Sequence, residues 1–346
     1  MTRILHTGAL GGSLFLLAAC GGGGGSGGER YSLESPQDAL RELSLAGLVL
    51  NDVPDGQPEG GTAAAAAKRL GGGSGWGAAT LPARPRNLAK ATVEDCPQGG
   101  ERKIDTGAKA RDFLSFDVED LGVSFYRETD DDCLYPVSIP APLTASKLYN
   151  GQFEDGDSGT LEDGSRYAYV VDGSGSSAYV TTYREFDSAN KLIYSEIQGS
   201  LGTVESLQAE DGALDVRADY DYSVDSSEWV NGRREDYFAI VKLGRNLLSP
   251  YRAFRDGQEL SFSGVYSYRT RDCPGSDVTV TTEQVIQLQQ VGNADYPVGG
   301  RLRLAAAGKS AVFQFNAGGG ATLTLDGRTE TLTQSQVRAA INDSPC

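Results

Sequence analysis

The sequence predicts a mostly β protein built as an antiparallel meander. Two observations support this: apolar and polar residues alternate with period two over long stretches, and Gly-containing turn signals separate these stretches. Short turns join antiparallel neighbours, because parallel strands need long crossovers. We expect roughly ten or more strands. They would form a large curved sheet, a sandwich or a barrel-like arrangement, with a short N-terminal helix.

The first 20 residues have the pattern of an export signal. Arg3 supplies a positive charge, and the apolar stretch that follows is too short for a permanent membrane-spanning helix. The boundary Leu17-Ala18-Ala19-Cys20 resembles the lipobox of bacterial lipoprotein signal peptides. In that family the cysteine thiol receives a lipid, the peptide is cut just before it, and the new amine is acylated. The resemblance therefore implies a signal peptide over residues 1–19 and a lipid anchor, with acyl chains such as palmitate, on Cys20.

The resemblance also implies a location in the cell envelope. Position 21 is Gly, whereas enterobacterial lipoproteins that stay in the inner membrane carry Asp at this position. We therefore expect a protein held by Cys20 on the outer membrane of a Gram-negative bacterium, on its periplasmic or its surface side. The membrane is its first expected partner.

A tether and a short helix follow the anchor. Residues 20–34 comprise the lipidated cysteine and a Gly/Ser tract, which suits a flexible linker. Ser35 is a helix N-cap candidate, Pro36 suits the first helical position, and Asp38 suits the first turn. The expected apolar stripe consists of Ala39, Leu40, Leu43, Ala46 and Leu50.

The rest of residues 35–93 is rich in Gly, Ala and Pro and reads as a low-complexity linker. The β body should cover residues 94–346. Its clearest alternating stretches lie at 114–119, 214–222 and 260–268. The turn signals between strands are Asp172-Gly173-Ser174-Gly175, Asn231-Gly232, Asp256-Gly257, Gly318-Gly319-Gly320 and Asp326-Gly327.

Two further features concern the organisation of the body. Thr333 can cap a C-terminal helix over Gln334–Ile341. The sequence Asp95-Cys96-Pro97 recurs as Asp272-Cys273-Pro274. This echo leaves open a body of two related β units, divided near residue 205, or a chance match.

Charge and composition exclude several functions. The formal net charge is −16, which opposes nucleic acid binding, since phosphate contacts need a basic surface. The one histidine, His6, lies in the expected signal peptide. The mature chain would then have no His-dependent catalysis and no His-ligated metal. We expect no enzyme and no cofactor.

The cysteines predict disulfides. With Cys20 lipidated, four remain, and an even number in an exported chain implies bridges. We favour the pairs Cys96–Cys133 and Cys273–Cys346 among the three connectivities. A tetrathiolate zinc site is the rival, but the short paired spacing that it needs is absent.

Acidic runs occur at residues 128–132 and 154–159. In the second run Asp155 and Asp157 stand two apart among glycines, as in some calcium loops. Counted from Asp155, the run does not match the EF-hand template, because its Gly stands at the fifth position instead of the sixth and no Glu stands at the twelfth. A solvated hairpin loop is the favoured interpretation, and calcium binding by Asp155 and Asp157 is the weaker one.

Tyrosines recur at spacings of two or four on the expected strands, which places them in rows on sheet faces. Cross-strand packing explains such rows without a ligand, and we favour it. An aromatic platform or cleft for a glycan, lipid or peptide is the other interpretation. The tyrosines are Tyr167, Tyr169, Tyr179, Tyr183, Tyr220, Tyr222, Tyr266 and Tyr268.

Three functions remain open. The first is a non-enzymatic binding or structural lipoprotein of the envelope, with a protein, glycan or lipid ligand. The second is a carrier or chaperone of lipid or lipoprotein, whose curved sheet encloses an apolar cavity. The third is a carboxylate-only hydrolase such as a glycosidase, which needs two Asp or Glu residues and no His.

Overall fold

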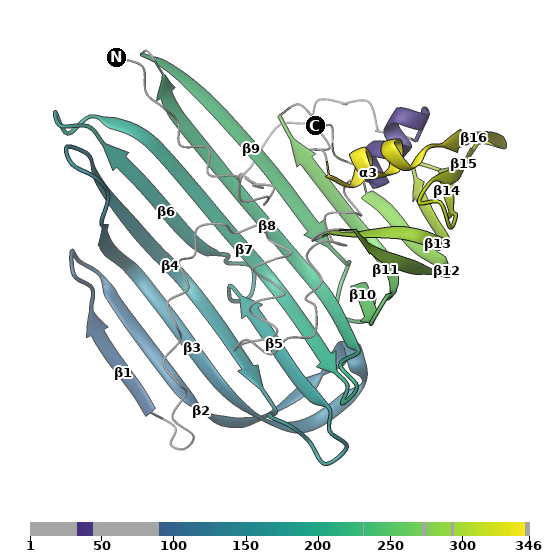
Figure 1. Cartoon of the computed structure of the whole chain (residues 1–346). Coiled ribbons are helices and arrows are strands. Elements are labelled where there is room, and N and C mark those ends of the chain that lie inside the picture. Colours follow the sequence, from purple (N-terminus) through teal and green to yellow (C-terminus); the bar gives the residue numbers. More distant parts are fainter. Residues whose placement is uncertain are drawn as a thin grey trace.

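The computed structural model describes residues 33–43, 90–230, 232–271, 275, 277–291 and 294–342. Sixteen strands form one antiparallel sheet, so the predicted mostly β fold is confirmed (Figure 1). The strands are β1 (Lys90–Asp95), β2 (Glu101–Phe113), β3 (Val118–Val137), β4 (Thr144–Asp157), β5 (Arg166–Asp172), β6 (Tyr179–Phe186), β7 (Leu192–Gln208), β8 (Leu214–Val230), β9 (Arg233–Leu243), β10 (Tyr251–Asp256), β11 (Glu259–Thr270), β12 (Asp277–Val291), β13 (Ala294–Ala306), β14 (Lys309–Phe315), β15 (Ala321–Leu325) and β16 (Arg328–Leu332).

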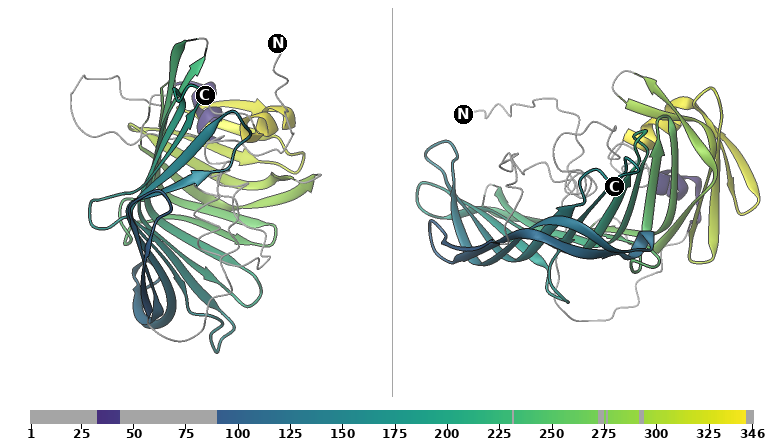
Figure 2. Two further views of the ribbon diagram at one scale, coloured as in Figure 1. Left: turned by 90° about the vertical axis from the view of Figure 1, so that its left-hand side faces the viewer. Right: turned by 90° about the horizontal axis from the view of Figure 1, so that it is seen from below.

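The sheet has two differently shaped parts. The strands β1 to β7, with the ends of β8 and β9 that are uppermost in Figure 1, form an open arc, which we call the extended part. The strands β10 to β16 curl around two helices and form the curled part (Figure 2). We call the face that lines the curled part the inner face, and the opposite face the outer face. The predicted division near residue 205 falls inside β7, where the sheet runs on without a break.

The main core fills the curled part. Alternate residues of β8 and of β10 to β16 point inward, because the period of a strand is two. Leu33, Ala39 and Leu43 come from the N-terminal segment and are fully buried among them. Val337 and Ile341 of the C-terminal helix α3 (Gln334–Asn342) join the same core. Two helices from opposite ends of the chain thus fill the inside of the curled part.

Both helices begin as the sequence predicts. The backbone N–H of Asp38 donates to the Ser35 hydroxyl, and the Ser35 N–H donates to the Asp38 carboxylate, which satisfies two otherwise free donors. Thr333 and Gln336 make the same reciprocal pair at α3. The helix of residues 36–43 is packed, with Leu43 in the core. Ala46 and Leu50 lie outside the described residues.

The tip of the β2–β3 hairpin folds against the outer face. The stretch at 114–119 is not one strand, as its alternation predicts, because Leu114–Phe116 forms a single 3₁₀ turn before β3. This turn brings the N–H of Ser115 to 3.0 Å from the fully buried carboxylate of Glu205 on β7. A buried carboxylate needs hydrogen-bond donors. The turn supplies a backbone N–H that would not reach Glu205 from a straight strand.

Two loops interrupt strands without reversing them. The segment at 173–178 separates β5 from β6, yet both strands pair with β4 and β7. The segment at 244–250 separates β9 from β10 in the same way, between β8 and β11. The predicted hairpin turn at Asp172-Gly173-Ser174-Gly175 is therefore a bulged-out loop within one continuous strand direction. The predicted turns at Asp256-Gly257, Gly318-Gly319-Gly320 and Asp326-Gly327 do join neighbouring strands.

Gly202 lets β7 bend between these two loops. Its φ is +131°, and a Cβ there would lie 2.2 Å from the carbonyl oxygen of Asp219 on β8. Only glycine tolerates such a backbone and such an approach. The sheet can therefore curve at this row.

Candidate functional site

Tyrosines and carboxylates line the inner face of the extended part. One cross-strand row contains Tyr183 beside Glu196, and the rings of Tyr183 and Tyr194 lie 6.0 Å apart. Along each strand these residues alternate with residues of the outer face. They lie on the same face of the sheet as Val224, a residue of the main core, and therefore on the inner face. The full row, from β3 to β9, is Tyr135, Lys147, Tyr183, Glu196, Ser226 and Tyr237.

At the β2–β3 side of this face an arginine joins two acids. Arg102 Nε lies 2.7 Å from Asp130 Oδ1, and Arg102 Nη2 lies 3.0 Å from Glu128 Oε1. Tyr179 donates to Asp130 at 3.0 Å, and Tyr126 donates to Glu128 at 2.7 Å. The Asp130 side chain is fully buried. The charge-assisted bonds satisfy both carboxyls.

This Arg102 cluster holds one more carboxyl than guanidinium. Burial, and secondly the charge of Asp130, raise the pKa of Glu128 to about 7, against the opposing effects of Tyr126 and Arg102. The rings of Tyr135 and Tyr149 lie 5.1 and 5.4 Å from the Arg102 guanidinium and help to hold it. Both carboxyls bind the same guanidinium, so the cluster does not present two acids across an open cleft.

The opposite end of the inner face is acidic. Glu228 on β8 stands directly opposite Glu235 on β9, and both are exposed. Like charges in this position destabilise a strand pair. Tyr183 donates to Glu185 at 2.5 Å and Tyr194 to Glu196 at 2.5 Å, which orients both rings. This end is therefore a surface of oriented phenols and carboxylates.

Only part of the predicted tyrosine rows lies on this surface. Tyr179, Tyr183 and Tyr222 do. Tyr167 and Tyr169 lie on the outer face, where both rings contact Phe113. Tyr220 lies opposite Gly202 in the strand register and belongs to the main core. Tyr266 and Tyr268 are buried in the same core. The spacing places a tyrosine on a strand but does not tell which of the two faces it occupies.

The signal for the Arg102 cluster is present in the sequence. Glu128 and Asp130 belong to the acidic run at 128–132, and their spacing of two puts them on one face of β3. The partner Arg102 could not be found this way, because strand pairing brings it in from β2, 28 residues from Asp130.

The weaker calcium candidates belong to a strand. Residues 154–157 end β4, so the expected hairpin loop does not begin until after Asp157. Asp157 pairs with Arg166 at 2.8 Å, and Asp155 is buried on the inner face beside Val170. Within the described ranges no group of three or more His, Cys, Asp or Glu side chains is placed to hold a metal ion.

One predicted disulfide is confirmed. Cys96 and Cys133 are bonded, and the bridge ties the β1–β2 turn to β3. Cys20, Cys273 and Cys346 lie outside the described residues, as does the second copy of the Asp-Cys-Pro sequence. The other predicted pair and the lipid anchor remain predictions.

Comparisons with protein-family models, curated proteins and solved structures found no match. In the part of the chain that the structure describes, no helix has the length and apolar character needed to cross a membrane.

Proposed function

We propose that this chain is a lipid-anchored binding protein of the bacterial envelope, and that it binds a partner protein through the inner face of the extended part. The observation that carries the proposal is the end of that face where Tyr183 and Tyr194 stand among Glu185, Glu196 and Glu228. Tyrosine is enriched at protein interfaces, because it offers a large, stiff contact surface with a polar tip.

The partner of this surface carries positive charge. Glu228 and Glu235 oppose each other, and neither forms an ion pair with another described residue, so a Lys or Arg side chain from a partner would relieve their repulsion. Arginine also stacks on phenol rings. The net charge of −16 steers cationic partners toward the protein.

The anchor completes the proposal. Acylation of Cys20 would hold the protein on the outer membrane of a Gram-negative host. The disulfide at Cys96 agrees with an oxidising compartment, where such bonds persist.

The other two functions have less support. A lipid carrier needs an apolar cavity, whereas Leu33, Leu43 and Val337 fill the inside of the curled part. A carboxylate-only hydrolase needs two acids facing each other across a cleft. Glu128 and Asp130, two neighbouring acids of the inner face, are instead bound to one guanidinium.

The test is an affinity capture with the unlipidated protein and matched charge reversals. Glu228→Lys should abolish capture of the partner; the new Lys also faces Glu235, so the fold should not weaken. Asp225→Lys makes the same change on the same strand but on the outer face, and it should leave capture intact. Capture that survives Glu228→Lys, or that Asp225→Lys removes equally, would refute the proposed surface.

A further inference from the structure

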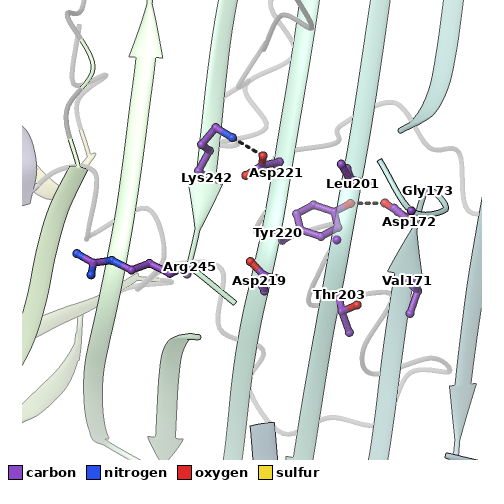
Figure 3. Close-up of a pocket in the computed structure, with 13 residues that line it drawn as sticks. Val171, Asp172, Gly173, Leu201, Thr203, Asp219, Tyr220, Asp221, Lys242 and Arg245 are labelled. Atoms are coloured by element: carbon purple, nitrogen blue, oxygen red, sulfur yellow. Dashed lines mark hydrogen bonds and ion pairs between the residues drawn. The ribbon is translucent and has the colours of Figure 1, made fainter. Parts of the chain in front are cut away.

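The two strand-interrupting loops enclose a groove on the outer face, opposite to the surface proposed above. The groove has a volume of about 530 Å³. Its floor is β7 and β8, with Leu201 and Thr203 from one strand and Asp219 and Asp221 from the other (Figure 3). Gly173 and Gly244 belong to its walls.

The two walls are built alike. In the first loop Ser174 and Ser177 exchange backbone hydrogen bonds, and the N–H of Gly173 donates to Gln152 on β4. In the second loop Asn246 and Ser249 form the same kind of bridge, and the N–H of Gly244 donates to Val265 on β11. Each wall is therefore fixed both internally and to the next strand, so the width of the groove is set by the sheet.

The two loops stand in symmetric positions about one residue pair. The residues flanking the first loop pair with Gly202 and Ser200, so this break faces Leu201. The residues flanking the second loop pair with Tyr220 and Ala218, so that break faces Asp219. Since Gly202 and Tyr220 pair with each other, a local two-fold axis passes between them.

Three aspartates and two cations line the groove, and one of the aspartates, Asp219, has no ion pair of its own among the described residues. Asp221 forms an ion pair with Lys242, while Asp219 has no hydrogen bond or ion pair with any described residue. Burial, and then the charge of Asp221, raise the pKa of Asp219, although Lys242 opposes this. A carboxylate that is partly removed from water beside another carboxylate gains most from a cation that approaches it.

We propose that this groove binds a primary alkylammonium group, such as that of an aliphatic amine or a lysine side chain. An ammonium group has three N–H donors. Asp219 would accept one, and the hydroxyl of Thr203, which faces Asp219 in the strand register, would accept another. Val171 and Leu201 offer apolar surface for the methylene chain. This site is independent of the inner face.

The charge pattern distinguishes an amine from other ligands. Three aspartates line the groove, but Asp172 accepts from Tyr220 and Asp221 is paired with Lys242, which leaves Asp219 alone for a divalent metal ion that needs six or more oxygen ligands. A small anion would meet Asp219 and Asp221 on the floor. Arg245 stands exposed at one rim, without a side-chain partner among the described residues, where it can contact an acidic group elsewhere on the ligand.

The test is a titration of the unlipidated protein with 1,5-diaminopentane, followed by NMR or calorimetry at low salt. Asp219→Asn should weaken binding at least tenfold without harm to the fold, because it removes a charge that burial opposes. Asp225→Asn, on the same strand and face but outside the groove, should change binding less than twofold. The uncharged 1,5-pentanediol should not bind.

Two outcomes would overturn the inference. Equal weakening by the two variants would show attraction to the net charge rather than a site, and unchanged binding by Asp219→Asn would place the amine elsewhere. Capture of a partner protein by the inner face should not respond to Asp219→Asn, so the two proposals can fail separately.

Discussion

Tyr220 on β8 donates its hydroxyl hydrogen to Asp172 at the end of β5, passing over Gly202 of the intervening strand β7 (Figure 3). Both residues are buried. Burial and the charge of Asp172 raise the pKa of the phenol, so it remains a donor at any physiological pH. The bond links β8 to β5 across β7, in the part of the sheet where the loops at 173–178 and 244–250 leave it.

Replacing Tyr220 by Phe should cost about 1–3 kcal/mol of unfolding free energy, because a buried acid loses a donor. Urea denaturation measures this. A double-mutant cycle with Asp172→Ala isolates the coupling of the pair. Tyr222→Phe is the control: Tyr222 shares the inner face, and its hydroxyl has no described hydrogen bond, so it should cost less than about 0.5 kcal/mol.

Gly202→Ala should destabilise the protein strongly, by about 3 kcal/mol or more, because the added methyl would meet the backbone of β8 at a φ that L-residues rarely adopt. Gly122→Ala on β3 is the matched change, since a Cβ there meets nothing within 4 Å. It should shift the thermal midpoint little. Similar losses in both variants would contradict the steric account of Gly202.

Glu128→Gln should change how stability depends on pH. In the folded protein Glu128 keeps its proton up to a pKa of about 7, whereas in the unfolded chain it loses the proton near 4.5. The folded state then binds more protons between these values, so this group makes stability fall as pH rises from 4.5 to 7. Urea denaturation at pH 5 and pH 8 should show that the variant gains about 2–3 kcal/mol relative to the parent. If the unfolding free energies of parent and variant changed equally between pH 5 and pH 8, the shifted pKa would be contradicted.

Opening the Cys96–Cys133 bridge should cost about 3–4 kcal/mol, as the loop-entropy relation gives for a separation of 37 residues. The double variant Cys96→Ala/Cys133→Ala should therefore melt at a lower temperature. Reducing agent should lower the melting temperature of the parent but not of this variant. Non-reducing peptide mapping would show in addition whether Cys273 and Cys346 pair.

Cys20→Ser should release the protein from the membrane fraction into the soluble part of the envelope, because it removes the acylated thiol. Fractionation with metabolic labelling by a palmitate analogue measures both effects. Label that persists on the variant, or continued membrane association, would refute the anchor.

Local chemistry made much of the fold predictable. Period-two alternation gave β8 and β11, and side-chain caps gave the two helices at Ser35 and Thr333. These signals lie within a few residues of each other in the chain, so one sequence suffices to see them. The Asp172-Gly173 signal misled for the same reason, since a turn sequence cannot tell whether the chain reverses or resumes its direction.

The sites depended on contacts that are distant in sequence. Arg102 meets Asp130 only because β2 pairs with β3, and the groove exists only because two loops interrupt strands on either side of β7 and β8. Tyrosine spacing gave rows but not faces, and so mixed Tyr169 of the outer face with Tyr183 of the inner face. Strand register, which a single sequence specifies poorly, decides both which distant residues meet and which face of the sheet a tyrosine occupies.

The packing of Leu33 and Leu43 into the curled part limits how far the protein can stand from a bilayer. If Cys20 is acylated, only the 13 residues from 21 to 33 separate the lipid from this fixed point. Fully extended, they reach about 45 Å; a chain free up to β1 would reach about 240 Å. In an acylated protein the docked helix would therefore shorten the tether about fivefold and keep the curled part near the membrane.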